Sequence, residues 1–175
     1  MKFEYPKLIY SKINIDKRGY LQEIYKRKNF KNNFKFSILV SSKKGVFRGF
    51  HFQKRKQQKK IVIVVKGSII DYCIDLRKKS KTFAKIFKFI LNENSILYIP
   101  AGFAHGYFGK KSENKIIYLL SNYRYIKYEN GLNVYDKNIN IKIDKKKLIL
   151  SKKDKFNLSL INFKKKLEPF DSKQL

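Results

Sequence analysis

Only two histidines occur in this chain of 175 residues, and both lie in similar surroundings. His51 is part of "GVFRGFHFQ" (45–53) and His105 is part of "YIPAGFAHGY" (98–107), so each is flanked by glycine and aromatic residues. A neutral imidazole can accept a proton near pH 7, which makes histidine a frequent general base. A single histidine on a strand is a hydrogen-bonded core residue about as often as it is a functional residue. Two in matching contexts indicate one shared site.

Two cations accompany the first histidine. Arg48 precedes it by three residues, and Lys60 follows the polar loop "KRKQQK". Side chains alternate along a strand, so Arg48 and His51 can share a cavity only if the chain bends between them, which Gly49 permits. The sequence predicts one β-hairpin that carries Arg48, His51 and Lys60. For His105, the preceding proline and glycine predict a bend at a strand end that directs the side chain into a barrel mouth.

The elements that must position these residues are strands. Apolar residues alternate with polar ones from about 34 to 125, in runs rich in Val, Ile, Phe and Tyr that are bounded by Gly, Asn and Ser. This pattern favours an all-β fold, either a meander or a jelly roll. One helix is predicted near 152–166, with Ser151 as its N-cap. Without an internal repeat or linker, residues 1–175 are expected to form a single domain.

The formal net charge of +29 requires an interpretation, because basic proteins often bind nucleic acid. Only six of the 42 basic residues are arginine, and the lysines are spread along the whole chain. We therefore expect a lysine-rich surface around a small-molecule site, with neither nucleic acid nor membrane as a partner. The apolar runs are far shorter than the about 20 residues of a membrane span. A lone Cys73 and no leader sequence favour the cytoplasm.

Several longer motifs resemble one family. The stretches "DKRGYLQE", "GVFRGFHFQ", "QKKIVIVVKGSIIDYCIDLRKKSKTF", "LYIPAGFAHGY" and "SKKD" are similar, in order and spacing, to the dTDP-4-dehydrorhamnose 3,5-epimerase family. The resemblance covers roughly residues 8–160. It implies a cupin-type jelly-roll barrel that epimerises C3 and C5 of a nucleotide-linked 4-keto-6-deoxy sugar without a cofactor. Many cupins bind a metal through several histidines, and two are too few for such a site, so no metal is expected.

The resemblance also implies roles for four catalytic residues. His51 resembles the family's general base and Asp154 the carboxylate that orients it. Tyr118 falls at the position of the acid that returns a proton to the opposite face of the sugar. Lys60 resembles the lysine beside the C4 oxygen, where a cation stabilises an enolate.

Further positions resemble those that bind the nucleotide sugar. They are Arg18, Glu23, Arg48, His105, Arg124, Glu129 and Lys153. The cations among them are expected to bind the diphosphate. The family forms homodimers by exchanging an N-terminal strand, and open sheet edges also favour pairing, so a homodimer is expected here.

Three positions that contact the nucleotide in the family depart from its pattern. Phe36 and Ile38 replace a glutamine and an asparagine that contact the nucleotide, and Arg124 replaces a tyrosine that stacks on the base. Arg124, Tyr123 or Tyr125 could stack instead. The alternatives are therefore a C3-only epimerase, an epimerase of another nucleotide sugar, and a catalytically silent sugar- or nucleic-acid-binding cupin. A 3,4-ketoisomerase fits less well, because "RGFHFQ" lacks a second histidine.

Overall fold

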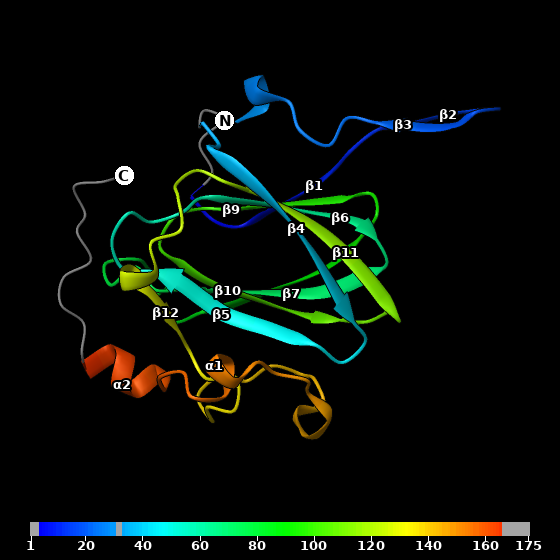
Figure 1. Ribbon diagram of the computed structural model, residues 1–175. Helices are drawn as coiled ribbons and strands as arrows, with labels where there is room; N and C mark the ends of the chain where they lie inside the picture. The colour runs from blue at the N-terminus through cyan, green and yellow to red at the C-terminus, as the bar shows by residue number, and fades with distance from the viewer. Residues whose placement is uncertain (1–3, 31–32, 166–175) are drawn as a thin grey trace.

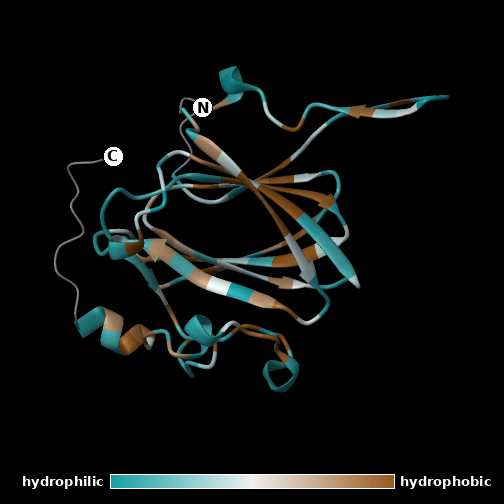
Figure 2. Ribbon diagram, in the orientation of Figure 1, coloured by the Kyte–Doolittle hydropathy of each residue, from teal (hydrophilic) through white to brown (hydrophobic). Residues whose placement is uncertain are grey.

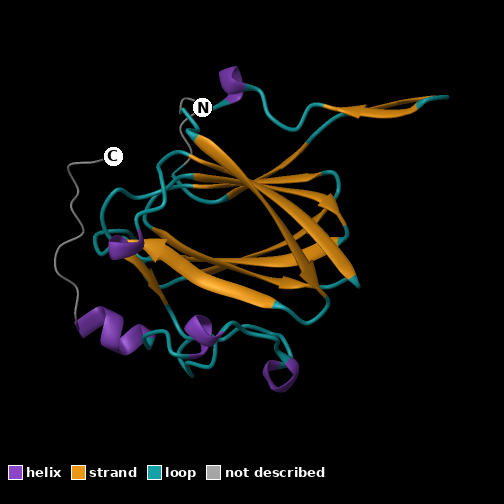
Figure 3. Ribbon diagram, viewed as in Figure 1, coloured by secondary structure: helices purple, strands orange, loops and turns teal. Residues whose placement is uncertain are grey.

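Two antiparallel five-stranded sheets face one another and make up most of the molecule (Figure 1). The computed structural model describes residues 4–30 and 33–165. Strands dominate it, and the helices are short and lie at the periphery (Figure 3). The predicted all-β jelly roll with short helices is confirmed. None of the helices in the described ranges is long and apolar enough to cross a membrane.

Each sheet combines strands that are distant in the sequence. The first has the order β1 (Lys7–Tyr10), β9 (Ser95–Ile99), β6 (Lys60–Lys66), β11 (Glu113–Leu120), β4 (Phe36–Lys43). The second has the order β12 (Glu129–Gly131), β5 (Phe47–Gln53), β10 (Phe103–Gly109), β7 (Ser68–Asp75), β8 (Ile86–Asn92). The remaining elements are β2 (Ile13–Asp16), β3 (Gly19–Gln22), η1 (Arg27–Asn29), η2 (Ile126–Tyr128), η3 (Lys145–Lys147), α1 (Lys152–Lys155) and α2 (Leu160–Lys165).

The space between the sheets is filled by alternate residues of the strands. In β11 every second residue is buried, and Ile116, Tyr118 and Leu120 belong to the cluster between the sheets. Successive side chains of a strand point to opposite faces, so this period of two places one face of β11 inside. Apolar residues are accordingly frequent on the strands, while many of the loops are hydrophilic (Figure 2).

Both outer faces of the barrel are also covered, which explains why β5 and β6 are apolar on both sides. Ile61 and Ile63 of β6 pack with Phe30 in a separate outer cluster. On the other sheet, Phe52 meets Phe163 of α2 edge to face, with ring centroids 5.2 Å apart. The C-terminal segment thus lies against the outside of the second sheet (Figure 1).

The predicted hairpin of Arg48, His51 and Lys60 is wrong. β5 lies in the second sheet beside β10 and β12, whereas β6 lies in the first sheet between β9 and β11. The loop at 54–59 therefore crosses from one sheet to the other. A short polar loop suits a hairpin and a crossover equally well, so the local sequence does not distinguish them. The consequence for the site is that His51 and Lys60 approach from different sheets.

The single helix predicted over 152–166 is also wrong. Ser151 does act as an N-cap, because its Oγ accepts a hydrogen bond from the Asp154 amide at 3.1 Å. However, α1 ends at Lys155, and Leu158 forms a parallel bridge with Leu132 before α2 begins. The backbone groups of Leu158 thus pair with another segment instead of a helix. Lys166 lies outside the described residues.

The hairpin of β2 and β3 projects away from the barrel (Figure 1). It carries three large apolar side chains that are mostly exposed, Ile15, Tyr20 and Leu21, with exposed fractions of 81%, 65% and 63%. Single exposed apolar residues are ordinary, but three on one short projecting hairpin mark a surface that is suited to contact another molecule.

Candidate active site

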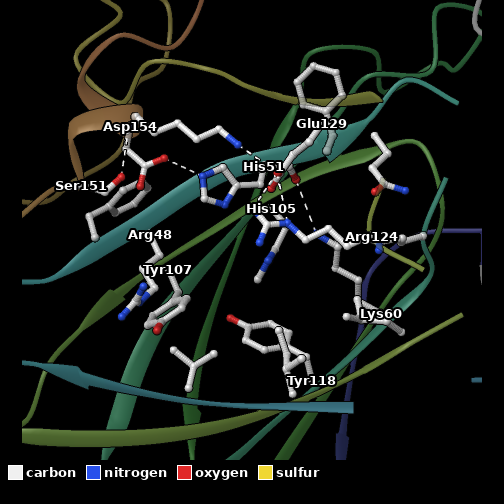
Figure 4. A pocket seen from close by; sticks show the side chains of 18 of the residues that line it. Arg48, His51, Lys60, His105, Tyr107, Tyr118, Arg124, Glu129, Ser151 and Asp154 are labelled. Atoms are coloured by element: carbon white, nitrogen blue, oxygen red, sulfur yellow. Dashed lines mark hydrogen bonds and ion pairs between the residues drawn. The ribbon is translucent and has the colours of Figure 1, made fainter. Parts of the chain in front are cut away.

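A cavity of about 600 Å³ opens between the two sheets, and both histidines line it. Ligand pockets commonly measure about 300–1,000 Å³, so this one could hold a nucleotide sugar in part or whole. Its walls come from β4, β5, β6, β10, β11 and the segment around α1 (Figure 4). The cavity therefore gathers most of the site residues predicted from the sequence.

His51 and Arg48 both face this cavity although they lie three residues apart on β5. Gly49 between them has φ +135°, a conformation that side chains other than glycine rarely adopt. A Cβ on Gly49 would also come within 2.4 Å of Gly106 Cα on β10. The predicted bend at Gly49 is confirmed, and it is what lets the cation and the imidazole share one side of the cavity.

Asp154 holds the His51 ring. His51 Nε2 lies 2.5 Å from Asp154 Oδ1, and the Asp154 side chain is only 4% exposed (Figure 4). Burial alone would raise the pKa of Asp154, but hydrogen bonds from His51, Ser151 and Asn157 outweigh it and lower that pKa. Asp154 is thus ionised near neutral pH and can only accept a hydrogen bond, so His51 Nε2 is the donor, and in a neutral imidazole Nδ1 then carries the lone pair.

His105 forms a second imidazole–carboxylate pair, deeper in the barrel. Its Nε2 lies 2.7 Å from Asp71 Oδ2, and both side chains are buried. Burial lowers the pKa of His105 and outweighs the opposing effect of Asp71, so this ring is neutral. The predicted bend before His105 is confirmed, since the chain turns at Ala101 and Gly102 between the end of β9 and the start of β10, and the His105 side chain lines the cavity.

Lys60 and Tyr118 approach from the first sheet, opposite His51. Lys60 Nζ reaches the His51 carbonyl oxygen at 3.5 Å, and burial lowers the pKa of this ammonium. Burial raises the pKa of Tyr118 well above its usual value, so its hydroxyl stays protonated. The Tyr118 ring meets His105 edge to face, with centroids 5.7 Å apart. Figure 4 shows Tyr118 and His51 on opposite sides of the cavity.

A charged cluster lies at the cavity near α1. Glu129 Oε2 accepts from Arg124 at 2.7 Å and lies 2.9 Å from Lys153 Nζ (Figure 4). Burial would raise the pKa of Glu129, but these two cations outweigh it and lower the pKa. The cluster keeps two exposed cations beside the cavity with one carboxylate between them.

Arg18 and Glu23 are not part of this cavity. Arg18 lies at the tip of the β2–β3 hairpin and pairs with Asp16 at 2.6 Å. Glu23 follows the hairpin and pairs with Lys26 at 2.5 Å. Within one copy of the chain, the structure therefore brings together nine of the eleven predicted site residues.

Several polar residues in or beside the site were not predicted, among them Asp71, Tyr107 and Ser42. Asp71 interrupts the apolar strand run "SIIDYCID", and a carboxylate buried in a strand is a usable signal. Tyr107 Oη and Ser42 Oγ are 2.8 Å apart, and Ser42 Oγ also accepts from Arg48 Nε at 3.0 Å. Neither Tyr107 nor Ser42 stands out in the sequence, because each fits its strand without any chemical role.

The β4 wall of the cavity is apolar. Phe36, Ile38 and Val40 line it, and the Phe36 ring stacks on Tyr123 with centroids 5.7 Å apart. Three side chains were suggested for stacking on the nucleobase. Arg124 is paired with Glu129, whereas the Tyr123 ring contacts Phe36 of the cavity wall. In the described residues no group of three or more His, Cys, Asp and Glu could hold a metal ion.

Comparison with known proteins identifies relatives across nearly the whole chain. A family model described as dTDP-4-dehydrorhamnose 3,5-epimerase matches residues 2–162. The enzyme of that name from Methanothermobacter thermautotrophicus is 32% identical over 160 residues, which cover 85% of each chain.

Solved structures agree with this assignment. A 3,5-epimerase from Legionella pneumophila in complex with dTDP-4-keto-L-rhamnose has a TM-score of 0.86 and 28% identity, with 92% of this chain and 90% of that chain covered. The dTDP-4-dehydrorhamnose 3,5-epimerase from Bacillus anthracis, with TDP and PPi bound, has a TM-score of 0.85 and 32% identity, with 89% and 94% covered.

Proposed function

The chain belongs to the dTDP-4-dehydrorhamnose 3,5-epimerase family, and we propose how its side chains epimerise C3 and C5 of dTDP-4-dehydro-6-deoxy-D-glucose. The product is dTDP-4-dehydro-L-rhamnose. Each inversion breaks a C–H bond next to the C4 ketone and forms a new one on the opposite face. The reaction therefore needs a base, an acid on the other side, and a group that stabilises negative charge on the C4 oxygen.

His51 is the base. Because Asp154 accepts from Nε2, the lone pair on Nδ1 is available to take the proton from C3 or C5. The electron pair of the broken C–H bond moves into the enolate, and the negative charge develops on the C4 oxygen. The imidazolium that forms is stabilised by the ionised Asp154. This step uses a base on the second sheet.

Lys60 stabilises the enolate. Its ammonium is buried beside the backbone of His51, so a charge that develops on the C4 oxygen would find a fixed cation in a water-poor setting. Burial lowers the pKa of Lys60, which means that the charged form is poorly solvated there and gains from a new negative partner.

Tyr118 is the acid. Its hydroxyl is protonated because burial raises its pKa, and it faces His51 from the other sheet. A proton that leaves towards His51 and one that arrives from Tyr118 act on opposite faces of a sugar held between the sheets, which is what inversion requires. The phenolate then regains a proton from water and the His51 imidazolium releases one to water, so both groups are restored for the second inversion. This opposition of His51 and Tyr118 is the observation that carries the proposal.

The cavity offers cationic side chains and an apolar wall to the nucleotide part of the substrate. We assign the diphosphate to Arg48, Arg124 and Lys153, which lie beside the cavity. The enzyme from Bacillus anthracis holds TDP and PPi, and that is consistent with a diphosphate subsite in this fold. His105 is proposed to contact the sugar, since it lines the cavity next to Tyr118.

Arg18 and Glu23 fit the proposal only in a homodimer. Their hairpin projects from the barrel and carries exposed Ile15, Tyr20 and Leu21, so docking onto a second copy would bury apolar surface and bring both charges to another subunit. Sedimentation at moderate salt should give about twice the 21.0 kDa of one chain. A monomer at both low and moderate salt would remove this part of the proposal.

Proton NMR in deuterated water tests the reaction. We expect deuterium at both C3 and C5 of the substrate and the formation of the L-sugar. Label at C3 alone would mean a C3-only epimerase, and label at neither carbon would contradict the proposal. A thermal-shift panel of dTDP, UDP, CDP and GDP identifies the preferred nucleobase. At equal concentrations, the nucleotide that binds most tightly raises the melting temperature most.

The contrasting function is a silent binding module, for which the net charge of +29 is the only support. Retention on DNA at about 150 mM salt would favour it, whereas scattered lysines should release DNA below that salt. We also propose a cytoplasmic location, because nucleotide sugars occur there and the buried thiol of Cys73 stays reduced there.

A further inference from the structure

Asp154 has a second side-chain partner besides His51. Asn157 Nδ2 donates to Asp154 Oδ1 at 3.3 Å, the same oxygen that His51 Nε2 reaches at 2.5 Å. Asn157 follows α1 by two residues and is not among the residues that line the cavity. Any influence of this amide on the reaction must therefore pass through Asp154.

The Asn157 amide is seated against a glycine of β12. A Cβ on Gly131 would lie 2.4 Å from Asn157 Nδ2 and 2.5 Å from both Cγ and Oδ1. Gly131 is not one of the glycines with positive φ, so its backbone would accept another residue. Space for the Asn157 amide is what excludes a side chain at position 131.

The same glycine is the neighbour of the base. Gly131 pairs with His51 across β12 and β5, and its carbonyl oxygen accepts from the Leu158 amide at 3.2 Å. The backbone N–H of Asn133 donates to the Leu158 carbonyl oxygen at 2.8 Å. These bonds attach the turn that carries Asn157 to the strand beside His51. They thereby fix the positions of Asp154 and Asn157 relative to His51.

We propose that Asn157, seated against Gly131, is a positioning residue that holds the Asp154 carboxylate towards His51. The inference rests on the proposed role of His51 as the base. The Asn157 side chain and His51 Nε2 both donate to Asp154 Oδ1, and Asn157 does not line the cavity, so this amide holds the carboxylate in the orientation that faces the imidazole. Loss of the amide would let Asp154 rotate, and the His51 ring would lose its fixed direction.

Two variants separate hydrogen bonding from packing. Asn157→Ala removes the amide, and Asn157→Asp keeps its shape against Gly131 but replaces the donor by an acceptor. We expect each to lower kcat about tenfold or more, the lower end of what a hydrogen bond to a charged group contributes, with KM within about twofold. Asn130→Ala, next to Gly131 on β12, removes a side-chain amide whose bond in the described residues is to the Tyr128 carbonyl oxygen, and it should leave kcat unchanged.

A double-mutant cycle tests the seat. Gly131→Ala should lower kcat by pushing the Asn157 amide away from Asp154. In the Asn157→Ala background the space is empty, so Gly131→Ala should then cost less than about twofold. Equal losses in both backgrounds would show that Gly131 acts on its own strand and not through Asn157.

An NMR measurement without substrate completes the test. With only His51 and His105 in the chain, the two imidazole N–H protons can be assigned from single His→Asn variants. Asn157→Ala should shift the His51 Nε2 proton and leave that of His105, which also reports whether the variant is folded. An unchanged His51 signal together with an unchanged kcat would overturn the inference. A shifted signal in an enzyme inactive on the dTDP sugar would instead contradict the proposed function alone.

Discussion

Replacing Asp154 by asparagine should reveal how much the carboxylate contributes to the base. The substitution keeps the size of the side chain and removes its charge. In the native site the carboxylate is 4% exposed and 2.5 Å from His51 Nε2, so an imidazolium formed by the proposed proton abstraction would lie beside a buried anion. The amide introduced by Asp154→Asn could still accept a hydrogen bond, but it could not stabilise that cation.

The size of the loss follows from this geometry. A hydrogen bond to a charged group is worth about 1.5–3 kcal/mol. Opposite unit charges about 4 Å apart attract by about 4 kcal/mol at an effective dielectric constant of about 20. The side chain of His51 is 32% exposed, so solvent screens part of the attraction, and the expected loss is below the about 4 kcal/mol of the unscreened pair. A loss of about 3 kcal/mol corresponds to a fall in rate of about 10²-fold.

The assay is the initial rate of deuterium entry at C3 and C5, followed by proton NMR in deuterated water. Asp144→Asn is a matched control, since Asp144 is an exposed acid on the same C-terminal segment and should leave the rate unaltered. We expect dTDP to raise the melting temperatures of both variants as much as that of the native protein. If Asp154→Asn kept more than a third of the native exchange rate while binding dTDP, the assignment of Asp154 as the partner of the base would be wrong.

Two further predictions concern charge in the barrel. Lys60→Met keeps the length of the stem and removes the ammonium, so kcat should fall about 10²–10³-fold with dTDP binding retained; a fall below threefold would contradict its role at the enolate. Buried Asp75 accepts from Arg77, Ser80 and Thr82, and although burial would raise its pKa, these bonds lower it. A lowered folded-state pKa gives stability above the unfolded value of about 3.9, which is lost as pH falls through the folded value. Asp75→Asn should therefore lower the melting temperature at pH 7, and the difference from the native protein should narrow towards pH 3. A difference that does not change with pH would contradict this role of Asp75.

Local sequence was sufficient where the chemistry depends on neighbours in the chain. The bend at Gly49 could be predicted because a cation and an imidazole three residues apart cannot share a strand face otherwise. The strands of the barrel could be predicted from alternation, as β11 shows residue by residue. The Ser151 cap was predicted from residue type alone.

Contacts between distant segments were beyond such reasoning. His51 and Asp154 are separated by 103 positions, and only the family resemblance linked them. The loop at 54–59 carries no mark that it crosses between sheets, so β5 and β6 were wrongly joined in one hairpin. The helix over 152–166 was overextended because the bridge of Leu158 to Leu132 depends on a segment that is distant in sequence.

The most direct test of a base and an acid on opposite sheets is Tyr118→Phe, measured for solvent exchange and for inversion in the same sample. His51→Asn should lower both by about 10²–10⁴-fold, because no group is left to abstract the proton. Tyr118→Phe should leave abstraction intact, so the enolate is reprotonated from the His51 side and deuterium enters C3 or C5 faster than the L-sugar accumulates. If Tyr118→Phe lost exchange and inversion equally while still binding dTDP, the two residues would not act on opposite faces.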